Sequence, residues 1–563
     1  MKYNKIVTAV ALCLSLSSCN FLDTVPQDFV SPENFFKNKE EAFMSLTTVY
    51  NRLTRQEVYG NTYPLMVTGT DDLGYYDRNN VPIGIFNNNI STSDNDVLKL
   101  WQNLYEAINN ANFFLENVGN VPDMDDKTRT LYIGEAKFLR AYCYFLLAQC
   151  WGDVPYKTES QKSVADVNIA NTSQKTVFEN VVAEMEEAER LVGEIDEVPA
   201  GRVNKSAVRG ILARVYLKLA GWPINGGKPM YEKANYWAKQ VNKDGKHQLN
   251  PHYQEIFVNL AADVVDTKYR ESIWEAEYKG NRQDAHAGSG RLGNTIGILN
   301  GDASTSSEGY SYGFISCTLN LWDMYNDLNG DGLVDDGFEE GSAKEKNHPD
   351  VRRDWNIAPY RYVKNSQNEY IKGGWGYKGD VKTDTDGNPS GLFTATQYVE
   401  RNAGKYRREY EKVLPRDKNQ TPINFPILRY ADVLLMIAET ENEINDGPTQ
   451  VAYDAVNAVR KRSIVGATDI SGMDYQAFKK LIKDERGREL CFEGLRKYDL
   501  IRWDDYLTNM RLVALNTQDS RWTAGKKFAV SYAENASERY KWLPIPNREL
   551  GLNKLLYQNK AWR

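Results

Sequence analysis

The stretch ERGRELCFEGLRKYDLIRW, residues 485–503, sets charged side chains between apolar and aromatic ones and carries the strongest signal for the fold. Within it, Glu485, Glu489 and Glu493 recur every four residues. A helix would place these carboxylates in a row of like charges, which repel one another unless nearby cations neutralise them. Gly494 is well placed to end that helix, because glycine tolerates the left-handed backbone of a helix C-terminus. The question is whether the carboxylates build a scaffold or an active site.

Cations accompany these carboxylates. Arg486, Arg488 and Arg496 are within helical reach of the glutamates, and Arg496, Asp499 and Arg502 recur every three residues on the segment that follows. Arginine can bond a carboxylate through two N–H groups, so the alternating signs favour a structural ion-pair network between helices. The alternative is a catalytic carboxylate pair, as in a glycoside hydrolase. Spacing in the sequence does not show the separation of carboxyl groups that such an enzyme needs.

Further amphipathic helices are expected on the N-terminal side of this stretch, because apolar residues recur there at helical spacing. The first would begin at Ser31, which precedes a proline at the first helical position. The expected helices cover residues 31–55, 97–118, 128–151, 176–192, 204–220, 231–241, 429–446, 449–463, 475–491 and 495–503. Small residues interleave with aromatic ones in the two helices over 204–241, which is typical of a tetratricopeptide-type helix pair.

The segment from about residue 251 to 426 has a different character. Short β-like runs such as ESIWEAEYKG alternate there with long stretches of Gly, Asp, Asn and Ser. Loops of that length are usually functional or disordered, and the aromatic content favours a binding surface. We therefore expect a mostly α fold, in which a tetratricopeptide-like helical-repeat scaffold carries a large loop-rich insertion containing short β-strands.

Composition narrows the class of protein. The 563 residues are 41% hydrophobic and 26% charged, as in a soluble globular protein. The 35 Tyr and 12 Trp supply many rings that suit stacking on flat ligands. The net charge of -7 gives no sequence-wide attraction to phosphate backbones, which argues against nucleic acid as a partner.

The N-terminus has the pattern of an export signal. Lys2 and Lys5 precede an apolar run over residues 6–16, which is too short to span a bilayer. The run ends in LSSC at Cys19, a sequence that resembles the bacterial lipobox. Residues 1–18 are then a lipoprotein signal peptide, and acyl chains on Cys19 anchor the protein to a membrane. The alternative is an ordinary signal peptide cut at a small-residue site.

Several longer motifs together resemble the SusD/RagB family of outer-membrane nutrient-binding lipoproteins over essentially the whole chain. These motifs are CNFLD from residue 19, GEAKFLRAYCYFLLAQCWGDVPY from 134, RVNKSAVRGILARVYLKLAG from 202, RYADVLLMIAETENE from 429, VNAVRKRS from 456, the opening stretch, and LPIPNRELGLNKLLYQN from 543. The resemblance implies a helical scaffold with a loop-rich ligand face. It also implies a lid on a SusC-like TonB-dependent outer-membrane transporter, and binding without catalysis.

This reading divides the mature chain into two regions. Residues 19–250 form an N-terminal SusD-like helical region, and residues 251–563 form the C-terminal SusD/RagB region. Within the latter, residues 251–426 are the loop-rich ligand face and residues 427–563 contain the returning helices. The protein is expected to lie at the cell surface, lipid-anchored in the outer membrane, where it captures oligosaccharides or polysaccharide and delivers them to the transporter.

Ligand residues are expected among aromatic and polar side chains in irregular segments, because sugar rings present an apolar face to aromatics and hydroxyls to polar groups. The family's ligand residues belong to no shared motif, so none is carried over by position. The segments TDDLGYYDRNN, EGYSYGF and GGWGYKG qualify. The candidates they supply are Asp72, Tyr75, Tyr76, Arg78, Asn79, Tyr310, Tyr312 and Trp375.

One acidic segment suits a metal ion. In NDLNGDGLVDD, Asp327, Asn329, Asp331 and Asp335 place oxygen atoms as in a short calcium loop. Phe338 stands where an EF-hand has its bidentate Glu, so Asp335 would close the site. The same residues also suit a solvated Asp/Gly turn, and the sequence leaves calcium binding and this turn open. No other cofactor is expected.

Common enzyme motifs are absent from the sequence. The four His are scattered without metal-ligand spacing, and no G-x-S-x-G elbow occurs. The later Cys residues form no close pair and are expected to be structural. We therefore expect a glycan-binding protein that is not an enzyme. The alternatives are a peptide-binding protein of the same lid type and, with less support, a glycoside hydrolase.

Overall fold

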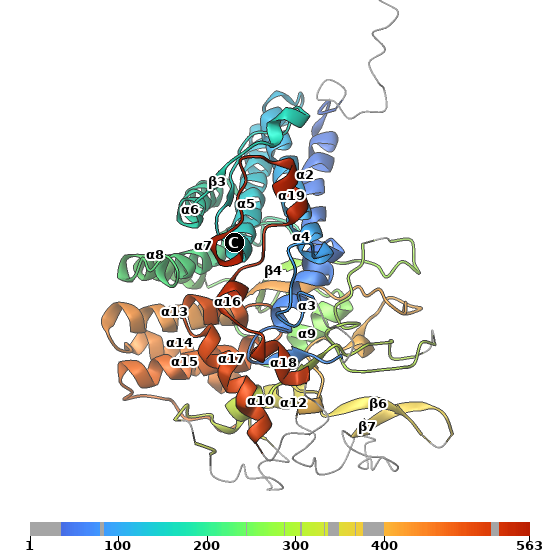
Figure 1. Ribbon diagram of the computed structural model, residues 1–563, viewed down its shortest axis with the longest axis vertical. Coiled ribbons are helices and arrows are strands. Elements are labelled where there is room, and N and C mark those ends of the chain that lie inside the picture. The colour runs from blue at the N-terminus through green and yellow to red at the C-terminus, as the bar shows by residue number, and fades with distance from the viewer. Residues whose placement is uncertain are drawn as a thin grey trace, which may run out of the picture.

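Figure 1 shows the computed structural model of the chain. The structure describes residues 35–78, 84–243, 245–286, 288–304, 307–331, 333–335, 348–365, 367–374, 399–519 and 528–563. The expected signal peptide over residues 1–18, the lipidation residue Cys19, and the ligand candidates Asn79 and Trp375 lie outside the described residues.

Helices stacked in chain order make up the N-terminal half. They are α2 (Lys39–Leu53), α4 (Asn95–Asn117), α5 (Asp126–Trp151), α6 (Gln174–Leu191), α7 (Lys205–Ala220) and α8 (Lys228–Lys243). Each of these helices packs against the next one along the chain. Such stacking of neighbours is the arrangement of helical-repeat proteins. The predicted mostly α fold is confirmed, and the stacking is consistent with a tetratricopeptide-like scaffold.

The chain returns to this stack after the inserted region. Helix α13 (Tyr430–Asn445) packs against α8, and α14 (Gln450–Ser463) and α15 (Tyr475–Leu490) pack against α13. In Figure 1 these three helices lie directly below α8 and extend the same stack. Helix α15 carries the first half of the opening stretch. It ends at Leu490, earlier than Gly494, because Phe492 already has a left-handed backbone at φ 64°.

Side-chain caps fix the start of most helices near the predicted positions. Asp94, Asp125 and Asn204 each accept a hydrogen bond from a backbone N–H in the first turn of α4, α5 and α7. The prediction of a first helix from Ser31 is wrong in its start. Helix α2 begins at Lys39, because Asn38 provides the cap and residues 35–38 are not helical.

Short antiparallel strand pairs occur in the inserted region and its neighbours, as predicted. The pairs are β1 (Gly74–Tyr76) with β5 (Ile315–Cys317), β2 (Val154–Pro155) with β3 (Asn171–Thr172), β4 (Ser272–Ala276) with β8 (Phe425–Arg429), and β6 (Tyr360–Lys364) with β7 (Tyr370–Gly374). The β1–β5 and β4–β8 pairs each join segments more than 100 residues apart. The β6–β7 hairpin projects from the body in Figure 1. The strands thus tie the insertion to the helical scaffold.

The inserted region also contains helices that the sequence did not predict. These are α9 (Tyr253–Ala262), α10 (Leu319–Asn326) and α12 (Val351–Asn356). Each has at most ten residues, too short for a clear periodic signal. Further short helices complete the chain: α3 (Thr62–Thr68), α16 (Arg496–Arg502), α17 (Tyr506–Leu515), α18 (Phe528–Glu534) and α19 (Asn547–Leu552). Helix α19 lies beside α4, where Gln102 donates a hydrogen bond of 3.0 Å to Glu549.

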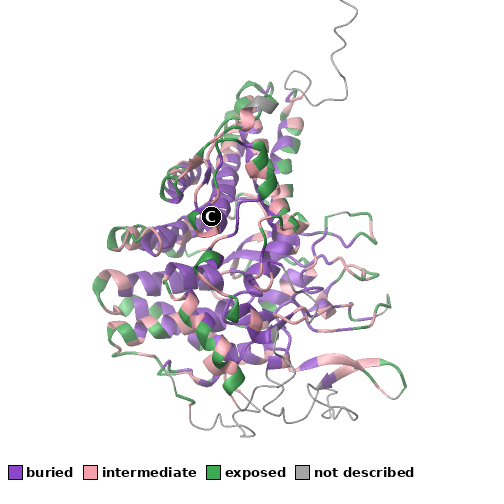
Figure 2. Cartoon of the chain, viewed as in Figure 1, coloured by how far each residue is buried: buried purple, intermediate pink, exposed green. Residues whose placement is uncertain are grey.

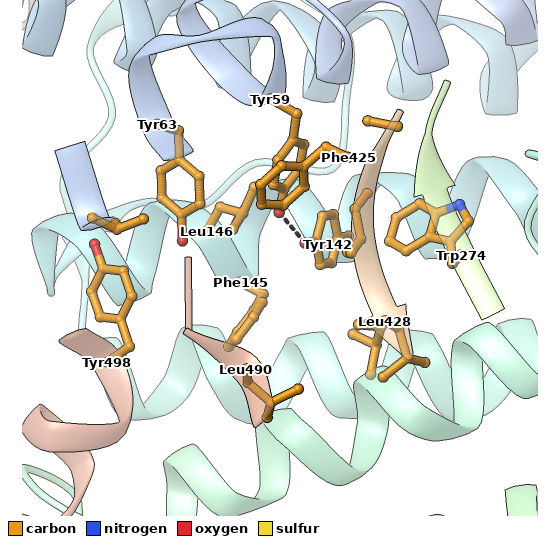
Figure 3. Close-up of a cluster of buried hydrophobic side chains, with 14 of the residues drawn as sticks. Tyr59, Tyr63, Tyr142, Phe145, Leu146, Trp274, Phe425, Leu428, Leu490 and Tyr498 are labelled. Atoms are coloured by element: carbon orange, nitrogen blue, oxygen red, sulfur yellow. Dashed lines mark hydrogen bonds between the residues drawn. The ribbon is translucent and has the colours of Figure 1, made fainter. Parts of the chain in front are cut away.

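One large hydrophobic cluster joins the scaffold and the insertion, as the continuous buried regions of Figure 2 indicate. In its centre (Figure 3), Tyr59 hydrogen-bonds Tyr142 of α5 and stacks on Phe425 of β8, with ring centroids 5.0 Å apart. Trp274 of β4 meets Tyr142 edge-on at 4.9 Å. Because these rings come from both regions, the loop-rich face is held rigidly on the helices.

Candidate functional site

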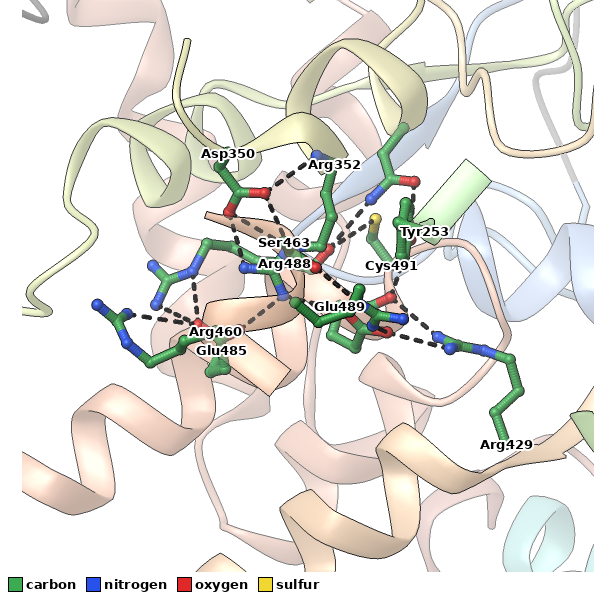
Figure 4. A network of polar contacts seen from close by, with 12 residues as sticks. Tyr253, Asp350, Arg352, Arg429, Arg460, Ser463, Glu485, Arg488, Glu489 and Cys491 are labelled. Carbon is green, nitrogen blue, oxygen red and sulfur yellow. Dashed lines mark hydrogen bonds and ion pairs between the residues drawn. The ribbon is translucent and has the colours of Figure 1, made fainter. Parts of the chain in front are cut away.

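The carboxylates of the opening stretch form a buried ion-pair network (Figure 4). The guanidinium of Arg352 contacts Glu485 at 2.6 Å and Glu489 at 3.0 Å. Glu489 also binds Arg429 at 3.0 Å and Arg462 at 2.6 Å. All five side chains are buried, so the network has no access to a ligand. The prediction of a structural network is therefore confirmed.

The electrostatics of this network oppose acid catalysis. Burial by itself raises the pKa of Glu485, but the charges of Arg352, Arg488 and Arg460 outweigh it and lower the pKa to about 2. The pKa of Glu489 is likewise lowered, because three arginines outweigh its burial. A glycosidase acid needs a raised pKa and an open position beside the substrate. The stretch that supplied the hydrolase alternative therefore lacks both properties.

Most partners in the network come from distant parts of the sequence. Arg488 does pair with Glu485, at 2.9 Å. Arg486, however, pairs with Asp432 at 2.7 Å and with Asp499 at 2.8 Å, so it does not answer the glutamate row of its own helix. Helical spacing in the sequence identified the charged residues of the network but did not identify most of their partners.

Two predicted ligand residues are part of this buried framework, which corrects the prediction. Asp72 is fully buried and accepts two hydrogen bonds from Arg496, at 2.7 and 2.8 Å. Tyr75 is 1% exposed, and its hydroxyl donates to the backbone oxygen of Val399. Tyr75 points inward because neighbouring residues of a strand face opposite sides, and Tyr76 takes the outer side of β1. The structure gives Asp72 and Tyr75 structural roles in place of ligand contact.

Other predicted ligand residues come together in a row of half-buried rings, which we call the aromatic strip. It consists of Phe86, Tyr76, Phe314, Tyr312 and Tyr310. Neighbouring ring centroids lie 5.1, 5.2, 5.0 and 4.9 Å apart along this order. All five side chains are partly exposed. The strip thus unites two segments, around residues 76 and 312, that sequence reasoning proposed separately.

Pairing of β1 with β5 brings these two segments together. Tyr76 is opposite Ile315 in the antiparallel register, so Phe314 lies beside it. On the far side, Tyr312 N–H donates to the Asn294 carbonyl and Phe314 N–H to the Thr295 carbonyl, both at 2.8 Å. The strip is therefore fixed by backbone hydrogen bonds on both of its sides.

Buried amide and guanidinium groups hold the Tyr310 end of the strip. The Asn294 side chain donates to the carbonyls of Tyr310, at 3.1 Å, and Lys418, at 2.9 Å. Arg408 donates to the Tyr310 carbonyl at 2.6 Å. The Tyr312 hydroxyl donates to the Asn419 side chain at 3.2 Å. These bonds tie the loop around residue 310 to the loop around residue 418 and order both.

Three cations lie over rings of the strip. The Arg78 guanidinium is 4.6 Å from the centroid of Phe314, that of Arg291 is 5.8 Å from Tyr312, and the Lys418 ammonium is 4.9 Å from Tyr310. Arg78 was predicted as a ligand residue and is partly exposed. Burial raises the pKa of Tyr76 and lowers that of Arg291. The strip is thus a surface of rings bordered by positive charge.

Four members of this site were missed by sequence reasoning: Phe86, Phe314, Arg291 and Lys418. Phe314 continues the alternate-residue spacing of Tyr310 and Tyr312, which was a usable signal for rings on one side of an extended chain. Nothing in the local sequence distinguishes the other three from ordinary surface residues. They join the strip through contacts with rings that lie 10, 21 and 108 positions away in the sequence.

The acidic loop after α10 keeps its carboxylates close together but engages them with protein donors. Asp335 accepts from the Leu328 N–H at 2.7 Å, and Asp327 accepts from the Asp331 N–H at 3.0 Å. The Lys480 ammonium lies 3.2 Å from Asp327. Phe338 lies outside the described residues. Within the described ranges, no group of three or more His, Cys, Asp or Glu side chains is arranged to hold a metal, so calcium binding stays a prediction.

The larger cavities lie away from the aromatic strip. A cavity of 580 Å³ between α4 and α19 is lined in part by Trp101, Tyr105 and Tyr144. Its rings are engaged in the fold, because Tyr105 donates to Pro155 at 2.8 Å and Tyr144 to Lys157 at 2.7 Å. An open hollow of 690 Å³ lies between α2 and α4. Trp101 and Tyr144 of the first cavity are buried, whereas every ring of the strip is partly exposed.

Two family models and a known relative match the sequence of this chain. Residues 270–562 match the model of the SusD family, and residues 20–217 match a model described as starch-binding associating with outer membrane. SusD-like protein P25 from Formosa agariphila is 25% identical over 605 aligned positions, covering 100% of this chain and 99% of the relative. No helix among the described residues has the length and apolar character needed to cross a membrane.

Solved structures share the same fold. A SusD homolog from Bacteroides thetaiotaomicron is 26% identical and superimposes with a TM-score of 0.80 over 94% of this chain and 98% of that one. Surface glycan-binding protein A from the same organism, solved in complex with laminarihexaose, is 20% identical with a TM-score of 0.65, over 93% of this chain and 99% of that one. The second likeness concerns the fold alone.

Proposed function

The chain belongs to the SusD family, and from this membership we propose that it is a glycan-binding protein of the outer membrane that captures oligosaccharides without cleaving them. The observation that carries the proposal is the aromatic strip. Sugar rings stack their apolar faces on aromatic side chains, and their hydroxyl groups bond nearby polar groups. The strip presents both, and backbone hydrogen bonds fix it on both sides, which lowers the entropy cost of binding.

Membrane attachment and transport complete the proposal. Acylation of Cys19 would hold the protein at the cell surface, and the bound glycan would pass to a SusC-like TonB-dependent transporter. Support comes from the lipobox-like LSSC sequence and from the family description, which names starch binding and the outer membrane. Expression with radiolabelled palmitate, with a Cys19→Ser variant as the control, tests the anchor. Label in the variant equal to that in the native chain would contradict it.

Calorimetric titration of the chain from Asn20 onward with neutral and acidic polysaccharides and their oligosaccharides tests the binding function. We expect saturable heat with at least one glycan. Tyr312→Ala should weaken that binding about tenfold, because it removes the ring between Phe314 and Tyr310. Tyr236→Ala is the matched control, since Tyr236 is an exposed tyrosine of α8 outside the strip.

Each other outcome of this titration has a defined meaning. Steady heat after every injection would show turnover and would contradict a binding protein. No binding heat with any glycan, together with saturable heat from a peptide library, would favour the peptide-binding alternative. If Tyr312→Ala and Tyr236→Ala weakened glycan binding equally, the aromatic strip would not be the binding site.

A further inference from the structure

The three cations of the aromatic strip have no carboxylate partner in the part of the chain that the structure describes. Arg78 donates to the backbone carbonyls of Asp77, at 2.6 Å, and Tyr312. Arg291 donates to the Asn294 side chain at 3.0 Å. The Lys418 side chain is exposed beside Tyr310. Within the described ranges, none of the three cations therefore has a carboxylate at ion-pair distance.

This arrangement differs from that of the buried ion-pair network. Arg352, Arg429 and Arg502 meet carboxylates directly, at distances of 3.0 Å or less. The whole chain carries a net charge of -7, so negative partners are not scarce. Holding Arg78 and Arg291 half-buried without an anion costs free energy through desolvation. An anionic ligand would remove that cost.

We propose that the aromatic strip selects acidic oligosaccharides, in which sugar rings bearing carboxylate or sulfate groups stack on the tyrosines while the anionic groups meet Arg78, Arg291 and Lys418. This inference rests on the proposed glycan-binding function and names its substrate class. The guanidinium groups supply paired N–H donors that match carboxylate and sulfate oxygens. The ammonium of Lys418 adds a mobile point charge at the exposed end.

The distribution of charge along the strip gives the ligand a direction. The cations accompany Phe314, Tyr312 and Tyr310 in turn. At the other end, burial is the largest cause that raises the pKa of Tyr76. The charges of Arg78 and Arg291 lower this pKa, and the negative charge of Asp96, in the first turn of α4, raises it to a smaller extent. Asp77 lies nearby and accepts a hydrogen bond of 2.9 Å from Ser316. The anionic groups of the glycan should therefore lie toward Tyr310, away from α4.

Paired probes that differ only in charge test the proposal. Oligogalacturonides are compared with the same chains after reduction of their carboxyl groups to alcohols, and carrageenan oligosaccharides with the same chains after desulfation. We expect the acidic member of at least one pair to bind about tenfold more tightly at low salt, and its advantage to shrink in 0.5 M salt. The pair that shows the larger difference distinguishes a carboxylate from a sulfate ligand.

Single variants locate the effect. Lys418→Gln and Arg78→Gln should each weaken acidic binding roughly two- to fivefold, and should weaken it more than they weaken the binding of neutral chains. Lys175→Gln, at an exposed position of α6, is the matched control and should change neither. Lys418→Gln is the safer variant for folding, because the Lys418 side chain is exposed.

Three results would overturn the proposal, and they differ in whether they also reject the glycan-binding function. Neutral chains that bind as tightly as their acidic counterparts, with Tyr312→Ala still harmful, would reject acidic selection while the glycan-binding function stands. Absence of binding by every acidic and neutral probe would reject both. Acidic binding that Lys175→Gln weakens as much as Lys418→Gln would show attraction by overall charge and would also reject the strip as its source.

Discussion

The buried ion-pair network and the aromatic strip both contain arginine side chains, but these arginines have different environments in the two regions. In the network, Arg352 and Arg429 each contact more than one carboxylate, and all the groups are removed from water. In the strip, Arg78 and Arg291 lie over rings, partly exposed, with no carboxylate beside them among the described residues. Burial and partnership, rather than residue type, separate a scaffold charge from a ligand-binding charge.

Acid should affect the network strongly. For Glu485, Asp432 and Glu439, burial raises the pKa, but neighbouring arginines outweigh it and lower each pKa to about 2. A lowered folded pKa contributes stability that is present above the unfolded pKa and is lost as pH falls toward the folded one. We therefore expect the free energy of unfolding in urea to fall steeply between about pH 5 and pH 2. Constant stability between pH 5 and pH 3 would contradict this account.

Removing one central carboxylate should be the most damaging single change. Glu489→Gln leaves the charges of Arg352, Arg429 and Arg462 partly unanswered inside the protein, which should lower the free energy of unfolding by about 3–5 kcal/mol. Glu187→Gln is the control, because Glu187 pairs with Lys137 at the surface and should cost at most about 1 kcal/mol. Denaturant titration of both variants measures the difference. Equal costs would mean that burial of the network adds nothing.

A change at Asp72 tests whether this residue has a structural role or contacts the ligand. Asp72 was predicted as a ligand residue and is found paired with Arg496. Asp72→Asn should lower the free energy of unfolding by roughly 3 kcal/mol, because it leaves Arg496 buried without its counter-charge. Glycan affinity of the folded variant, measured by calorimetry below its unfolding temperature, should be unchanged. A loss of affinity without a loss of stability would restore Asp72 as a ligand residue.

Calcium should have the smallest effect. If Asp327, Asn329, Asp331 and Asp335 bind the ion, 5 mM calcium should raise the melting temperature by a few degrees relative to chelator, on the order of what 1–2 kcal/mol produces. Asp331→Asn should abolish the rise without altering the chelated protein. Identical melting curves in calcium and chelator would identify the loop as a solvated turn whose charges are met by Lys480 and backbone N–H groups.

Sequence reasoning located helices well and contacts poorly, and particular residues show why. The ends of α5 and α7 follow from Asp125 and Asn204, because a capping side chain bonds N–H groups only two or three residues away. The partner of Asp72 is 424 residues away in the sequence. No local pattern specifies a contact at that distance, since it exists only after the strands and helices between the two residues have packed.

The candidate site divides in the same way. The sequence by itself determined the mostly α scaffold, the family, and the rings at Tyr76, Tyr310 and Tyr312, because helical periodicity, caps and composition are local properties. Only the tertiary structure decided that Tyr75 faces inward and that Arg291 and Lys418 join the strip. Strand pairing and core packing choose which side of each segment meets water, and those choices depend on partners from the whole chain.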